Sequence, residues 1–481
     1  MPETKQDILE QTHPDYDALS PDWQLYSDAY RGGRDWTDGG YLFKFVREPA
    51  GDYEDRQTRA YYLNYVRAII DAYVSFVYRE EITRTADNGA LLRFWDEADQ
   101  NDNPIQAFMA ERAAPLVFAF GTLYAGIDKP TLADGTTPAS RADESAMGLT
   151  PRANIVSPLR LRDWGRDALG AFSWVRIQED LEYDAGPWAE RADAGVGYRT
   201  WTATEWALND ADGITLEEGT HVIGEVPIVS FVPFEDPFHT RQGLSVIRDI
   251  APLARQLFNV CSLLDEFLYK QCFNILAIDS EWFNDESRRT LGISNAIPTY
   301  KDGVEPKYIS PPVDPAEFLQ EERKRIIAEI YRLAFLEYRT AERAGQPQSG
   351  IAKAYDLHDL NQYLAKLAQN LEAGERHMAR LVLRWSGVKG TNEQLNDQFE
   401  VNYPRDFQIE DAAEVLDSAL SAVELGMPSG VTKALKKRAA KVILGEDYTD
   451  EMGDEIDAAA DEPARTRAVD ALGDQFPPLA E

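Results

Sequence analysis

The chain has 481 residues, and its 83 acidic side chains outnumber its 49 lysines and arginines, which gives a formal charge of −34. A hydrophobic share of 44% allows large buried cores and excludes a disordered chain, and the length predicts roughly two to four domains. The charge argues against a protein that wraps nucleic acid with its general surface. The sequence also has no apolar run of ~18 residues and no N-terminal signal-peptide pattern.

Cysteine and lysine are both scarce. The two cysteines, Cys261 and Cys272, exclude a disulfide scaffold and a cysteine-rich zinc site. On one helix they would lie ~16 Å apart, too far to bridge, so we interpret them as buried apolar thiols. The acid excess, with 14 lysines against 35 arginines, indicates a surface adapted to high salt, where screening over ~3 Å at about 1 M removes most self-repulsion. An ordinary acidic protein from a GC-rich genome is the alternative.

Apolar periodicity predicts helices in the first part of the chain. Residues 14–31 form an amphipathic pattern, and apolar side chains recur in steps of three and four from Asp55 to Tyr78, which predicts one strong helix. Asn103–Pro104 is a typical helix start, with Asn as the cap and Pro at the first helical position. The apolar run that follows is broken by Pro115.

A β region follows a predicted loop. Residues 130–152 are rich in Pro, Gly, Ser and Thr and predict a surface loop. Residues 153–232 alternate Val-, Ile-, Trp- and Thr-rich stretches with turn signals, which predicts strands. Asn209–Gly213 contains a fragment of a calcium-binding loop but lacks the rest of that pattern, so we interpret it as a tight turn.

Two predicted helices flank a short insert in the next segment. The first helix begins or kinks at Pro252, and its apolar stripe steps by four and three. The stripe residues are Leu253, Leu257, Val260, Leu264 and Phe267. Residues 273–313 form a compact insert with apolar pieces and the hairpin-type dipeptide Asp302–Gly303. The second helix begins at Asp314–Pro315, with Asp as its cap, and extends to about Leu336.

A polar stretch leads into a long predicted helix over residues 351–385. Its leucines recur in steps of three and four and form a heptad-like seam. The seam residues are Leu357, Leu360, Leu364, Leu367 and Leu371. We expect them to pack inside the subunit or between subunits, and a free coiled-coil partner site is the alternative. A short strand at 399–403 precedes a helical tail, and we expect the last ~30 residues, which are acidic, to fray.

The sequence carries no catalytic constellation. It lacks the glycine-rich phosphate loop of ATP motors, and Gly243–Ser245 lacks the second glycine of a nucleophile elbow. None of the five histidines stands at metal-ligand spacing from another histidine or a cysteine. We therefore expect no enzymatic activity, no cofactor and no metal site. The abundant carboxylates leave a metal-dependent nuclease as the weakest alternative.

The order of the elements resembles that of portal proteins of tailed double-stranded DNA viruses, over about residues 15–410. In chain order the similar pieces are the first portal helix, the strand that enters the stem, the stem–clip–stem unit and the tunnel loop. The segment similar to the first portal helix is Tyr53–Val77, with Arg56 and Asn64, and the segment similar to the strand is Val226–Phe231, followed by Gly243–Ser245. Residues 241–336 are similar to the stem–clip–stem unit, and Ser349–Ala352, before the leucine-rich helix, is similar to the tunnel loop.

The resemblance implies an α+β, mainly helical portal fold with wing, stem, clip and crown, assembled as a ring around a central channel. Its division of the chain is 1–240 wing, 241–272 first stem helix, 273–313 clip, 314–336 second stem helix, 337–350 tunnel loop, 351–409 long wing helix and returning strand, and 410–481 crown with an acidic tail.

The resemblance also implies a function and partners. Portals of this family form a ring, typically of about twelve copies, at one capsid vertex of the virion, and are made in the host cytoplasm. The ring is the channel for DNA packaging and ejection. The implied partners are further copies of the chain, the major capsid protein, the terminase large subunit, the head–tail connector and the double-stranded DNA in the channel, with no membrane. An acidic channel lining suits this role, because basic side chains that neutralise DNA phosphates would bind the DNA and slow its passage.

The predicted tunnel loop holds the candidates for contact with DNA. They are Arg339, Arg343, Gln346 and Gln348. In the opposing interpretation both arginines are solvated or pair with Glu337 and Glu342. If the resemblance fails, the next hypothesis is a non-catalytic helical scaffold or adaptor that dimerises through the leucine seam.

Overall fold

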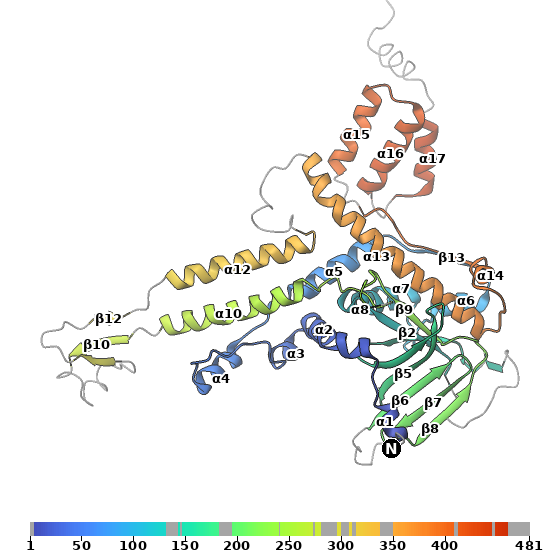
Figure 1. The fold of residues 1–481 in the computed structure, drawn as a ribbon. Helices are drawn as coiled ribbons and strands as arrows, with labels where there is room; N and C mark the ends of the chain where they lie inside the picture. Colours follow the sequence, from blue (N-terminus) through green and yellow to red (C-terminus); the bar gives the residue numbers. More distant parts are fainter. Residues whose placement is uncertain are drawn as a thin grey trace, which may run out of the picture. The chain divides into compact units, whose positions relative to one another are not determined.

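Figure 1 shows the fold as a computed structural model that forms two compact units. The first unit consists of residues 1–346 and 362–407, and the second of residues 347–361 and 408–481. The residues that the structure describes are 4–130, 143–144, 147–181, 195–239, 241–272, 275–279, 296–299, 307–309, 314–336, 350–407, 412–444 and 448–459. Within these ranges, no helix has both the length and the hydrophobicity needed to cross a membrane.

Five helices open the first unit. They are α1 (Lys5–Leu9), α2 (Pro14–Arg31), α3 (Gly33–Thr37), α4 (Ala50–Arg59) and α5 (Tyr65–Val77). The prediction of α2 is confirmed, but the single helix predicted from Asp55 to Tyr78 is wrong, because the chain leaves helical geometry between α4 and α5. At this break Tyr62 stacks on Trp36 with ring centroids 4.3 Å apart. Asn64 caps α5 by accepting from the Arg67 amide at 2.8 Å.

The helix predicted to start at Asn103–Pro104 begins one residue later. Pro104 is the N-cap of α7 (Ile105–Ala107), which continues as a π-helix (Phe108–Ala113) and then as α8 (Ala114–Phe120). The predicted break at Pro115 is therefore wrong. A proline has no N–H to donate and crowds the preceding turn, and the wider π turn just before Pro115 accommodates both effects.

Two antiparallel sheets confirm the predicted β region. One has the order β3–β2–β9, and the other has the order β4–β5–β6–β7–β8. Their strands are β2 (Leu123–Asp128), β3 (Arg152–Val156), β4 (Leu161–Arg166), β5 (Phe172–Asp180), β6 (Val196–Thr202), β7 (Glu205–Asp210), β8 (Thr215–Thr220) and β9 (Ile228–Phe231).

The predicted tight turn lies between β7 and β8. Asp210 Oδ1 accepts from the amides of Asp212 and Ile214, and Gly213 adopts a φ of 85°. Strand β8 is an edge strand with largely exposed side chains, and Lys5 Nζ donates to Thr215 Oγ1 at 2.9 Å beside it. The predicted loop at 130–152 falls mostly outside the described residues, and β3 occupies its end.

The long helix α13 (Gly350–Trp385) confirms the prediction for residues 351–385. A two-stranded antiparallel ribbon of β1 (Thr83–Ala86) and β13 (Phe399–Asn402) lies beside it, with α6 (Gly89–Asp96) and α14 (Asn392–Asn396) nearby in sequence. Helix α13 approaches β9 closely at Gly374, where a Cβ atom would lie 2.1 Å from the Phe231 ring. A side chain at position 374 would therefore force the helix or the Phe231 ring to shift.

A buried network fastens α13 to the β1–β13 ribbon. Arg84 donates to both carboxylate oxygens of Glu375, at 2.6 and 3.1 Å, and to Gln106 Oε1 at 2.7 Å. The Tyr403 hydroxyl donates to Glu375 Oε2 at 2.6 Å. Glu375 is fully buried, so each of these bonds satisfies a group that water does not reach.

The second unit contains the helical tail that the sequence predicts. Its helices are α15 (Ala412–Glu424), α16 (Ser429–Leu444) and α17 (Asp450–Ala459). Lys437 on α16 donates to Asp457 on α17 at 2.6 Å. The terminal ~30 residues that we expect to fray lie almost entirely outside the described residues.

Candidate functional site

Helices α10 (Ile250–Cys272) and α12 (Asp314–Leu333) pack side by side as an antiparallel pair (Figure 1). Each buries an apolar face, with Leu257 and Leu264 on α10 and Ile326 and Ile330 on α12. This pair confirms the two helices predicted around the insert, although α12 ends at Leu333. Cys261 is a buried free thiol on α10, as interpreted from the sequence.

A small sheet joins the two helices. Strand β10 (Ile275–Asp279) follows α10, pairs in parallel with β11 (Ala296–Thr299), and pairs antiparallel with β12 (Lys307–Ile309), which precedes α12. The apolar pieces of the predicted insert thus form strands, and the predicted hairpin dipeptide Asp302–Gly303 lies outside the described residues. Residues 250–333 are therefore one continuous excursion of helix, sheet and helix.

One stripe of α10 holds the segment of residues 42–59, which includes α4. The stripe residues recur in steps of four and three, and are Arg255, Asn259, Ser262, Glu266 and Tyr269. Asn259 ties the segment down at one end, because its Oδ1 accepts from the Phe43 amide at 2.8 Å and its Nδ2 donates to the Tyr41 carbonyl at 2.9 Å.

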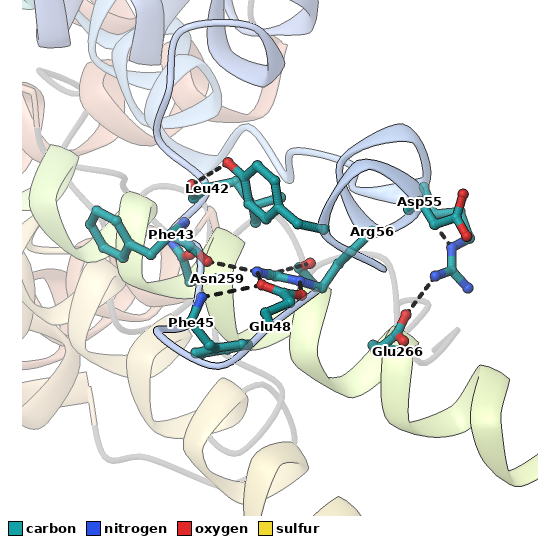
Figure 2. Close-up of polar contacts among 11 residues, drawn as sticks. Leu42, Phe43, Phe45, Glu48, Asp55, Arg56, Asn259 and Glu266 are labelled. Carbon is teal, nitrogen blue, oxygen red and sulfur yellow. Dashed lines mark hydrogen bonds and ion pairs between the residues drawn. The ribbon is translucent and has the colours of Figure 1, made fainter. Parts of the chain in front are cut away.

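Arg56 is the centre of this attachment (Figure 2). The guanidinium is 2% exposed and binds Glu48 through Nε at 2.8 Å and Nη2 at 2.9 Å. It also donates to the Phe43 carbonyl at 2.6 Å and to Ser262 Oγ at 3.2 Å. Glu48 in turn accepts from the Phe45 amide at 3.2 Å. The bonds from Arg56 hold the pKa of the Glu48 carboxyl below its usual value.

A second arginine continues the attachment toward the end of α10. Arg59 pairs with Glu266 at 2.5 Å and lies over the Tyr269 ring, with its Cζ 4.2 Å from the ring centroid. The pocket between α4 and α10, about 240 Å³ in volume and lined in part by Arg59 and Asp265, is smaller than typical ligand sites of about 300–1,000 Å³. We interpret this region as a fixed surface and not as a small-molecule site.

The loop wrapped around Arg56 is exposed on its outer side. Phe43 and Phe45 are about half exposed, and Val46 is completely exposed. Lys44 and Arg47 are exposed between and beside them. Five consecutive exposed residues of this kind form an apolar and basic patch in a chain with a charge of −34.

The candidates for DNA contact cannot be placed on the structure. Arg339, Arg343, Gln346 and Gln348 lie outside the described residues. Of the seam leucines, Leu360, Leu364, Leu367 and Leu371 are buried in the single chain, and Leu357 lies on α13 without a described side chain.

Sequence reasoning missed the loop of residues 43–47 and its attachment through Glu48. The signal that could have found it is the run Phe-Lys-Phe-Val-Arg between Gly40 and Pro49, because two aromatic residues and two cations are unusual on the surface of so acidic a chain. Among the described residues, no group of three or more His, Cys, Asp or Glu side chains is arranged to hold a metal ion.

Comparison with known proteins gives only distant likenesses. No family model matches the chain, and no curated protein matches it. A chain from the neck of an empty gene transfer agent (GTA) particle, computed with C6 symmetry, is 12% identical, covers 83% of this chain and 99% of its own length, and has a TM-score of 0.42. A chain from the neck of a native GTA particle, computed with C12 symmetry, is 11% identical, with coverages of 82% and 99% and a TM-score of 0.36. Likenesses at these TM-scores do not assign a fold.

Proposed function

We propose that the chain is a portal subunit, which forms a ring at one capsid vertex of a tailed-virus-like particle. The ring would pass double-stranded DNA during packaging and ejection, and would bind the terminase, the head–tail connector and the capsid protein. In this assignment α10 and α12 form the stem, β10–β12 form the clip, residues 337–350 form the tunnel loop, and residues 410–481 form the crown.

The observation that carries the proposal is the excursion of residues 250–333. Helix α12 has 20 residues and spans about 30 Å, and α10 runs alongside it. Only one face of α12 is buried, around Ile326 and Ile330, while its outer face is exposed. Copies arranged around an axis would cover the sides of such helix pairs and leave one face toward a channel.

The burial of the leucine seam argues against the competing dimeric scaffold. Leu364, Leu367 and Leu371 are at most 1% exposed in the single chain. A coiled-coil dimer through this seam would need these side chains on the surface. The burial of these three leucines supports packing within the subunit over pairing with a second chain.

The ring is tested by native mass measurement with electron microscopy of the purified chain, in molar salt and in dilute buffer. We expect a ring of about twelve copies with a central hole in molar salt, because screening relieves repulsion between subunits that each carry a charge of −34. Loss of the ring in dilute buffer would support adaptation to high salt. A monomer or dimer under both conditions would contradict the proposal.

The tunnel loop is tested separately. We propose that Arg339, Arg343, Gln346 and Gln348 contact DNA in the channel. Deletion of residues 340–348 should then leave the ring intact and reduce the amount of DNA packaged or retained in particles. A deletion that prevents ring formation would show that this stretch has been misassigned. The matched control is deletion of residues 131–139, a stretch of the same length within the surface loop predicted at 130–152.

A further inference from the structure

The loop of residues 43–47 is rigidly held, although its own side chains are exposed. Arg56 binds the Phe43 carbonyl and Glu48 beneath the loop, and its guanidinium lies 4.8 Å from the centroid of the Phe45 ring. The Tyr53 hydroxyl donates to the Leu42 carbonyl at 2.9 Å. A buried arginine with so many partners fixes the shape of an apolar surface before anything binds to it.

Helix α12 presents an exposed surface of complementary character. Four exposed residues share one face of the helix, because the last three follow the first by three, four and seven positions. They are Asp314, Glu317, Phe318 and Glu321. Phe318 is about two-thirds exposed and is flanked by the carboxylates, whereas the buried Ile326 and Ile330 lie on the opposite face. The start of this outer face, at residues 314–321, is thus acidic around one aromatic side chain, before the exposed Lys324 and Arg325 of the next turn. The loop at 43–47 is basic around aromatic and aliphatic side chains.

The loop at 43–47 and the outer face of α12 lie on different sides of α10, at similar positions along its length. Figure 1 shows α10 between α4 and α12, and both helices contact α10. Gln256 on α10 donates to Glu322 on α12 at 3.5 Å. From this contact, the C-terminal part of α10 and the N-terminal part of α12 both extend toward the small sheet. Residues 314–321 therefore lie alongside the part of α10 that follows Gln256. The loop and α4 attach along an overlapping part of α10, from Arg255 to Tyr269.

We propose that residues 43–47 of one copy bind the outer face of α12 in a second copy of this chain. Phe45 and Val46 would pack against Phe318, and Lys44 and Arg47 would face Glu317 and Glu321. A contact between two different, complementary patches is head-to-tail, which builds a ring where the rotation between copies closes and does not build a simple two-fold dimer. The proposal rests on the ring proposed above and names the surfaces that build it.

The apolar part of the contact is tested by Val46→Asp, measured as ring mass under conditions in which the unchanged chain assembles. We expect loss of the ring, with circular dichroism and thermal unfolding unchanged, because Val46 is completely exposed in the single chain. The matched control is Val222→Asp, since Val222 is 84% exposed on another part of the chain. Rings of normal mass from the Val46→Asp chain would overturn the contact.

The polar part is tested by exchanging charges at the lowest salt at which the ring forms. Lys44→Glu with Arg47→Glu, and separately Glu317→Lys with Glu321→Lys, should each raise the concentration for half-assembly by roughly tenfold or more. Combining all four changes should restore assembly toward the original value. Additive losses in the combined chain would show that the two patches do not meet and would overturn the proposal.

A cross-link separates this contact from the ring itself. Chains that carry only Val46→Cys are mixed with chains that carry only Phe318→Cys, and the mixture is oxidised in molar salt. We expect a disulfide-linked dimer from the mixture and none above the unchanged-chain background from either variant alone. A dimer formed by Val46→Cys chains alone would indicate a symmetric contact and contradict the proposal. If the unchanged chain forms no ring and the mixture no dimer, the ring and the contact both fail.

Discussion

A buried arginine, Arg56, and a partly buried one, Arg84, bind carboxylates with nearly the same geometry but in different surroundings. Arg56 and Glu48 approach to 2.8 Å, and Arg84 and Glu375 to 2.6 Å. Glu375 is fully buried, and its other partner, Tyr403, is buried as well. The Glu48 side chain is 10% exposed and supports a loop whose Phe45 ring is half exposed.

The difference shows that one kind of interaction serves two purposes in this molecule. Around Arg84 the carboxylate partner, Glu375, is fully buried on α13, so the pair specifies how α13 meets the β1–β13 ribbon. Around Arg56 the partners are Glu48 and the Phe43 carbonyl of one surface loop, together with Ser262 of α10. Since burial of an ion pair is weak evidence for stability, the second pair is better explained by the shape that it imposes than by its energy.

Removing the core carboxylate should have the largest effect. Glu375→Ala leaves Arg84 and the Tyr403 hydroxyl buried without their shared acceptor, which should lower the free energy of unfolding by about 3–5 kcal/mol. Denaturant or thermal unfolding of the first unit measures this change. Glu400→Ala, on the exposed side of β13, is the control and should change little. Equal midpoints for both variants would show that the buried pair does not hold the ribbon.

Removing the surface carboxylate should open the loop and spare the core. Glu48→Gln should cost about 2 kcal/mol at most, because the loop of residues 42–48 can open and let water reach Arg56. Hydrogen exchange should accelerate at the Phe45 amide, which donates a hydrogen bond to Glu48, and should remain slow in β1 and β13. Faster exchange in the β1–β13 ribbon as well would mean that the loop and the core are one cooperative unit.

The same loop predicts a pH dependence. The pKa of Glu48 is lowered in the folded chain by the bonds from Arg56, so its stabilising effect is present above the ordinary glutamate pKa of about 4.3 and is lost as the pH falls through the lowered value. Exchange at the Phe45 amide, corrected for its intrinsic pH dependence, should therefore stay slow at pH 5. Loop opening already at that pH would contradict the assignment of the acceptor.

Asp128 extends the comparison to a carboxylate that no arginine or lysine side chain pairs with among the described residues. Burial raises its pKa to about 6, so the folded chain binds the proton more tightly than the unfolded chain does. Ionisation of Asp128 therefore lowers the free energy of unfolding as the pH rises from about 4 to above 6. Asp128→Asn removes this loss and should raise the free energy of unfolding by about 1–2 kcal/mol at pH 7.5. Unfolding midpoints at pH 4 should coincide with those of the unchanged chain, and a gain of equal size at both pH values would rule out ionisation as its source.

The smallest effect is expected where an arginine is partly exposed. Arg59→Ala removes the bond to Glu266 and the contact with the Tyr269 ring, but the Arg59 side chain is 34% exposed and already screened by water. The free energy of unfolding should fall by less than about 1 kcal/mol. A loss as large as that of Glu48→Gln would place Arg59, and not Arg56, at the centre of the attachment.

Much of the fold follows from local patterns, and its exceptions come from distant contacts. Helices α10, α12 and α13 follow from apolar spacing, and α10 and α12 also from a proline near their starts. The break between α4 and α5 does not, since residues 60–64 keep the apolar spacing of a helix. Stacking of Tyr62 on Trp36 and the bond from Asn64 to the Tyr30 carbonyl favour the extended form there.

The candidate site was the harder part to predict. Arg56 was singled out in the sequence only through a family resemblance, because one of its partners, Ser262, lies 206 residues away. The same limit applies to Arg84 and Glu375, which are separated by 291 residues. An arginine in a helical pattern is ordinarily exposed, so its burial becomes visible only when distant segments are brought together.

Strand β8 has a further consequence for the proposed ring, in which many copies of the chain would meet. It forms the edge of the five-stranded sheet, where unpaired backbone groups could template pairing with the same strand of another copy. Its exposed side chains include Glu217 and Glu218, and Lys5 from α1 bonds to Thr215 at its start. Like charges brought together by edge-to-edge pairing repel each other, so crowded subunits are directed away from sheet-mediated aggregation.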